Sequence, residues 1–129
     1  MVSDELKSHF ANLYNMVMAD DKVKPEELAQ LYAIGKRHGI SEDEFNKILL
    51  SPIDFVKPNT LDKKVEYLYN LAEIIYADRD VDENEVATLK RYCVKFGFEP
   101  ENSDEIADFL IESVKSGDSL QDVFNKINS

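Results

Sequence analysis

The sequence predicts an all-α protein that folds as a single compact domain of about seven helices. Apolar residues recur three and four positions apart in seven successive segments, which is the spacing of one helix face. No stretch alternates apolar and polar residues for long enough to indicate a strand. Glycine and proline number four each and, apart from Gly35, fall between these segments. A length of 129 residues fits one domain, so we assign residues 1–129 to one helical unit.

Each expected helix has its own apolar face. In the first half of the chain the faces run over residues 6–17, 28–35 and 45–49. In the second half they run over residues 65–75, 86–96, 106–114 and 120–127. Ser41 and Glu44 form a capping box, which predicts a helix start. Gly39 and Gly97 each follow a face, where a left-handed C-terminal cap favours a residue without a Cβ atom.

The chain contains an internal repeat. An offset of 58 residues aligns positions 12–40 with positions 70–98 without a gap and gives nine identities, well above chance. Each copy reads as a helix, an acidic turn, a second helix and a glycine stop. A helix pair cannot bury its apolar faces alone, so we expect the two copies, about 5–50 and 62–115, to pack on each other.

The turn inside each copy carries a shared motif, Ala-Asp-x-x-Val-x-x-x-Glu, at residues 19–27 and 77–85. Two such motifs in a small acidic all-α chain resemble the TerB-like tellurite-resistance family. Where that family usually has glycine after the Asp, this chain has Asp21 and Arg79. The resemblance implies a compact seven-helix fold, a bacterial stress-response or envelope-complex setting, and acidic residues able to bind divalent cations. It implies no catalytic reaction.

The acidic turns are the candidate metal site. Carboxylate oxygens suit hard cations, so the ion would be calcium or magnesium, bound weakly in an open cluster. An EF-hand loop is excluded, because Glu83 stands at its glycine position and Leu89 at its twelfth position. The candidate ligands are Asp20, Glu27, Asp78, Asp80, Asp82 and Glu85.

These acidic residues also have structural interpretations. Glu27 and Glu85 are expected at the third position of a helix, where a carboxylate favours the positive end of the dipole. Asp20 and Asp78 are expected at a helix C-terminus, where a carboxylate is disfavoured. A turn in which the Asp accepts loop N–H groups, a bound cation, or plain surface charge would each account for that pair.

Composition excludes several classes of function. A net charge of −11 disfavours nucleic-acid binding, and no apolar run is long enough for direct membrane insertion. The start of the chain has no export signal, so we expect a cytoplasmic protein. Cys93 is the single cysteine, which we expect to be buried and inert. With no nucleophile–base pair and no phosphate-binding loop in the sequence, we expect no enzyme.

The sequence thus favours a non-catalytic stress-response or interaction module that binds divalent cations weakly at its acidic turns. The alternative is a protein-binding adaptor with no metal role, which uses its acidic second half or its tyrosine-lined helix faces. Residues 1–58 carry a net charge of −3, and residues 59–129 carry −8. The expected partner is therefore a protein that is basic or associated with a membrane complex.

Overall fold

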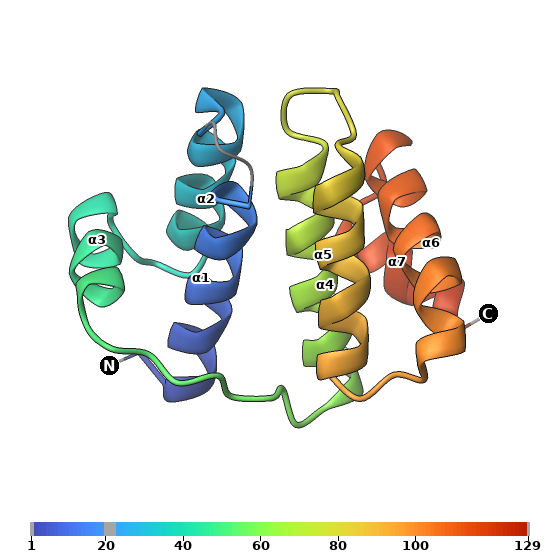
Figure 1. The fold of residues 1–129 in the computed structure, drawn as a ribbon, viewed down its shortest axis with the longest axis horizontal. Coiled ribbons are helices and arrows are strands. Elements are labelled where there is room, and N and C mark those ends of the chain that lie inside the picture. Colours follow the sequence, from blue (N-terminus) through green and yellow to red (C-terminus); the bar gives the residue numbers. More distant parts are fainter. Residues whose placement is uncertain (1, 20–22, 129) are drawn as a thin grey trace.

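The computed structural model describes residues 2–19 and 23–128 and is 71% helical (Figure 1). Within those residues it has seven α-helices, one short 3-10 turn and no strand, which confirms the predicted all-α class and single compact domain. None of the described helices combines the length and the apolar character needed to cross a bilayer. The α-helices are α1 (Asp4–Val17), α2 (Pro25–Arg37), α3 (Glu42–Leu50), α4 (Leu61–Ile75), α5 (Glu83–Lys95), α6 (Ser103–Lys115) and α7 (Leu120–Ile127).

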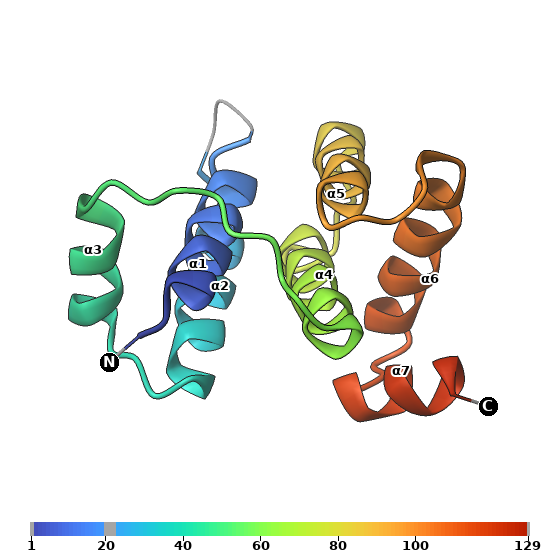
Figure 2. The same ribbon diagram turned by 90° about the horizontal axis from the view of Figure 1, so that it is seen from below.

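Helix α4 is the centre of the fold. It packs against α1 and α2 on one side and against α5 and α6 on the other. Figure 2 shows α3 at the outer edge of the first side and α7 below α6 on the second. The segment 51–60 joins the two halves along one end of the molecule (Figure 1). A single apolar core runs through both halves, as expected for two copies that cover each other's faces.

The helix bounds follow the 58-residue repeat. Helices α2 and α5 each span 13 residues and begin and end at equivalent positions. Both stop at a glycine with positive φ, +77° at Gly39 and +104° at Gly97. In each stop the next residue, Ile40 or Phe98, donates its N–H to a carbonyl five residues back, which is the long bond of a Schellman cap. The predicted glycine stops are therefore confirmed.

Equivalent residues of the two copies meet at the interface between them. His9 and Tyr67 lie 58 positions apart, and their rings stack with centroids 3.7 Å apart and planes 7° apart. Two residues related by the repeat therefore lie side by side at the interface between the copies. His9 Nε2 also contacts Asn70 Oδ1 at 2.9 Å. Complete burial lowers the pKa of His9 to about 3, so the ring is neutral at physiological pH.

Cys93 lies fully inside the core, as predicted. Burial raises the pKa of its thiol to about 11, which leaves almost no thiolate at neutral pH. We expect a thiol reagent at pH 7.5 to label native Cys93 very slowly. Labelling in denaturant should be at least about 100-fold faster. Mass spectrometry of timed samples measures both rates. Rapid native labelling would contradict the burial and reopen a redox role.

Candidate cation site between the two repeats

Two glutamates from equivalent positions form the centre of the site. Glu27 lies in the first turn of α2 and Glu85 in the first turn of α5, both at the predicted third helical position. Both side chains are almost completely buried, with exposed fractions of 2% for Glu27 and 1% for Glu85. Buried carboxylates are costly unless they are paired or protonated. A helix N-terminus offsets only part of that cost, so further partners are needed.

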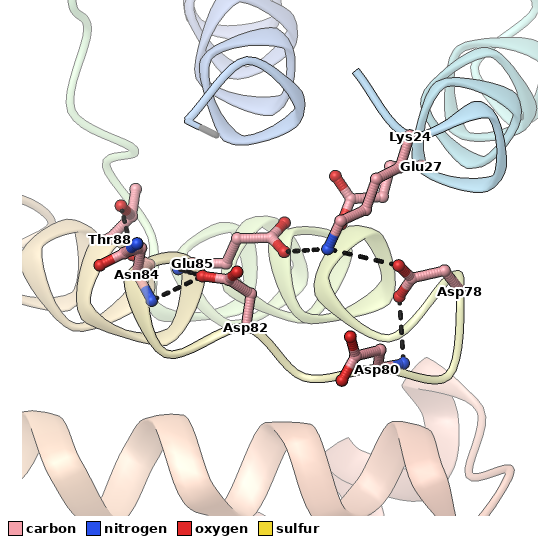
Figure 3. Close-up of polar contacts among 8 residues, drawn as sticks. All are labelled: Lys24, Glu27, Asp78, Asp80, Asp82, Asn84, Glu85 and Thr88. Atoms are coloured by element: carbon pink, nitrogen blue, oxygen red, sulfur yellow. Dashed lines mark hydrogen bonds and ion pairs between the residues drawn. The ribbon is translucent and has the colours of Figure 1, made fainter. Parts of the chain in front are cut away.

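Lys24 supplies the positive charge (Figure 3). It occupies the N-cap of α2, and its side chain reaches across to the second copy. Its Nζ atom lies 3.3 Å from Asp78 Oδ2, 3.4 Å from Glu85 Oε1 and 3.9 Å from Glu27 Oε2. Burial lowers the pKa of Lys24, but the hydrogen bond to Asp78 and the surrounding carboxylates outweigh it and raise the pKa above its ordinary value. Lys24 therefore stays charged and bridges the two repeats.

One positive charge does not balance the two buried glutamates and Asp78. Within the described residues, neither Glu27 Oε2 nor Glu85 Oε2 has a hydrogen-bond donor when both groups are ionised. Burial, then the hydrogen bond and the charge of Glu85, raise the pKa of Glu27 to about 9. Burial also raises the pKa of Glu85, although its bonds to Glu27 and Lys24 oppose that shift. At neutral pH Glu27 is therefore protonated and can donate to Glu85.

The three aspartates of the second turn have different roles. Asp78 Oδ1 accepts the N–H of Asp80 at 3.1 Å, which is the predicted turn, while its other oxygen contacts Lys24. This turn requires a left-handed residue, which is Arg79 with φ of 66°. Asp82 caps α5 by accepting the N–H groups of Asn84 at 2.7 Å and Glu85 at 3.3 Å. The side chain of Asp80 is exposed.

The structure thus brings together only part of the predicted ligand set. Glu27, Asp78 and Glu85 surround Lys24, whereas Asp80 lies on the exposed side of the turn (Figure 3). Asp20 lies outside the described residues. Within the described ranges, no three His, Cys, Asp or Glu side chains are placed to hold one metal ion. In this arrangement the carboxylates are held around an ammonium group instead.

Sequence reasoning did not identify Lys24 as a member of the site. The signal was present in the repeat, because Lys24 aligns with Asp82, an exchange of opposite charges at one position. Read in the linear sequence, Lys24 is only a helix N-cap before a proline. Its role appears only when the second copy brings Asp78 and Glu85 within reach of its ammonium group.

Comparisons of the chain with protein-family models, with curated proteins and with solved structures gave no match. The resemblance to the TerB-like family therefore stays a prediction from the two acidic motifs.

Proposed function

We propose that this chain is a non-catalytic, cytoplasmic interaction module of the stress-response type that binds a divalent cation weakly at the Glu27–Glu85 pair. The observation that carries this proposal is the buried pair of carboxyl groups next to the ammonium group of Lys24, whose Oε2 atoms have no donor in the described chain once the proton of Glu27 leaves. A calcium or magnesium ion would satisfy both oxygens and would replace the ammonium as the central positive charge. Asp78 would have to shift to supply a third carboxylate, because no three acidic side chains of the described chain are placed around one ion.

The chemistry of the donor set favours a hard cation. The side chains around Lys24 offer carboxylate oxygens, the ligands that calcium and magnesium prefer. Binding requires Lys24 to move out and the proton on Glu27 to leave, and both steps reduce the affinity. The exchange accounts for the expected weakness of the site, with Kd on the order of 1 mM. The affinity should rise with pH, since fewer molecules then carry the competing proton.

The first test is thermal unfolding with and without calcium or magnesium. An ion at about 10 mM with Kd on the order of 1 mM stabilises the native state by roughly 1.4 kcal/mol. That corresponds to an increase in Tm of about 3–5 °C for a chain of this size. We expect the increase in the parent and not in the double variant Glu27→Gln, Glu85→Gln, which keeps the shape of the pair and removes its charge.

Asp80→Asn is the matched control, because Asp80 belongs to the same turn but is exposed. It should keep the full ion-specific increase in Tm. Sodium chloride at equal ionic strength corrects for screening of the −11 charge. An equal increase in the parent and in the double variant would contradict the site.

The second candidate function is an adaptor that binds a basic protein and has no metal role. It is favoured by a run of exposed carboxylates on and before α6. Within the described chain only two of them form ion pairs, Asp104 with Lys90 at 3.0 Å and Glu112 with Lys115 at 3.6 Å. Such a face would attract a basic partner, alone or within a membrane-associated complex. The carboxylates are those of Glu99, Glu101, Asp104, Glu105, Asp108 and Glu112.

Binding to an immobilised Lys-rich peptide distinguishes the two functions. An adaptor of this kind should lose binding when Asp108 and Glu112 are changed to Asn and Gln and should be indifferent to calcium. A cation-dependent module should retain its calcium response in the same variant.

A further inference from the structure

The repeat predicts two equivalent helix interfaces, α2 with α4 and α5 with α1. The first is closed, in the sense that its helices pack directly against each other. Helix α2 packs against α4, and Glu73 of α4 joins the two helices. Glu73 Oε1 accepts from Arg37 Nη2 at 2.8 Å, and Glu73 Oε2 accepts from Gln30 Nε2 at 3.3 Å. A carboxylate on one helix is thus held by a cation and an amide on the other.

The equivalent interface, between α5 and α1, is open. The repeat places Lys95 at the position of Arg37 and Thr88 at that of Gln30, so the cation and the polar group are kept. The acid is not kept, because Asn15 stands at the position of Glu73. Helices α1 and α5 are not among the closely packed pairs, and a groove of about 530 Å³ lies between them.

The described lining of the groove is positively charged although the chain carries −11. Among the described residues that line it none is acidic, while Arg91 and Lys95 both face it. No carboxylate of the described chain forms an ion pair with either cation. Lys95 Nζ lies over the rings of Phe55 at 4.8 Å and Tyr92 at 5.5 Å. Arg91 Nη2 donates to Thr88 Oγ1 at 2.8 Å, so both cations are held in place by neutral partners.

The groove is also long enough for a short peptide segment. Its lining follows α5 from Asn84 to Lys95, a length of about 16 Å at the rise of an α-helix. We propose that this groove binds an acidic segment of a partner protein, whose carboxylate takes the position that Glu73 occupies in the closed interface. The site is separate from the Glu27–Glu85 pair and does not rest on cation binding there. It selects an acidic partner, whereas the exposed face before and along α6 would select a basic one.

The test is fluorescence anisotropy at 150 mM salt with a labelled 12-residue Glu/Ala peptide and the same peptide with Gln in place of Glu. The Glu peptide should bind and the Gln peptide should bind at least 10-fold more weakly. Lys95→Gln and Arg91→Gln should each reduce the affinity about 5–10-fold, as expected for loss of one charge-assisted contact. Lys47→Gln, an exposed cation on α3 with the same charge change, should leave it unchanged.

Asn15→Glu gives a test that adds a charged contact at the interface instead of removing one. The new carboxylate restores the acid of the closed interface, so it should pair with Lys95, raise Tm and reduce peptide affinity at least 10-fold. Three results of the peptide experiment would overturn the proposal. The first two are equal binding of both peptides and an equal loss of affinity in Lys47→Gln and Lys95→Gln. The third is displacement of the peptide by glutarate at the same concentration of carboxylates, which would indicate a small-molecule site. A dimer in sedimentation that Lys95→Gln dissociates would identify a second copy as the occupant and would equally overturn it.

Discussion

Replacing Glu27 with Gln is expected to stabilise the protein and to remove most of its pH dependence between pH 7 and 8.5. Over that range the free energy of unfolding of the parent should fall by about 2 kcal/mol, at close to 1.4 kcal/mol per pH unit for one proton. The variant should change by less than about 0.5 kcal/mol. Urea unfolding followed by far-UV circular dichroism at several pH values measures both slopes.

The fall in the free energy of unfolding with rising pH follows from the raised pKa of Glu27. In the native state this pKa is about 9, against an ordinary value of 4.5, so the folded chain holds a proton that the unfolded chain has released. The stability from that proton is complete below pH 4.5 and is lost as the pH rises through 9. The amide of Gln resembles the protonated carboxyl and can still donate to Glu85. His9 does not interfere, since its ordinary pKa of 6.5 lies below the window and burial lowers it further.

Glu26→Gln is the control for this experiment. Glu26 is the neighbour of Glu27, carries the same charge and is exposed, so its removal tests only the change in net charge. It should leave the slope of the parent intact. A Glu27→Gln variant with the slope of the parent would show that the pair is ionised in the native state.

The fold was largely predictable from the sequence because its signals are local. The capping box of Ser41, the glycine stops and the helical spacing each concern residues within one or two turns of one another. The repeat also predicted that the two copies share a core. What the repeat could not predict is which residues of the two copies meet, since that depends on how the copies are oriented. The stacking of His9 on Tyr67 is one such contact.

The candidate site was predictable only in part, for a related reason. Sequence spacing identified Glu27, Asp78 and Glu85, but it could not place Asp78 near Glu27, which lies in the other copy. It also grouped Asp80 with them, because neighbours in a turn look alike in the sequence, although only Asp78 contacts Lys24 and Asp80 is exposed. Lys24 was missed because its long side chain acts across the interface and not along its own helix.

Replacing Lys24 with Met should have the second large effect, in the opposite direction to Glu27→Gln. Removing one partner of a buried ion pair leaves the other without compensation. Because Lys24 is partly exposed, we expect a loss of about 2 kcal/mol in metal-free buffer at pH 8, or about 5 °C in Tm. Lys36→Met, an exposed cation on the same helix, should change the stability by less than about 0.5 kcal/mol.

The same variant should bind calcium more tightly than the parent does. Lys24 occupies the position that we assign to the ion, so binding in the parent includes the cost of displacing the ammonium group. Without it, the buried oxygens of Glu27 and Glu85 have only the ion as a positive partner, and the affinity should rise at least tenfold by isothermal titration calorimetry. Calcium should then restore most of the lost stability. A Lys24→Met variant that is destabilised but binds calcium no better than the parent would show that the pair is a structural ion bridge, with no room for a metal between the two repeats.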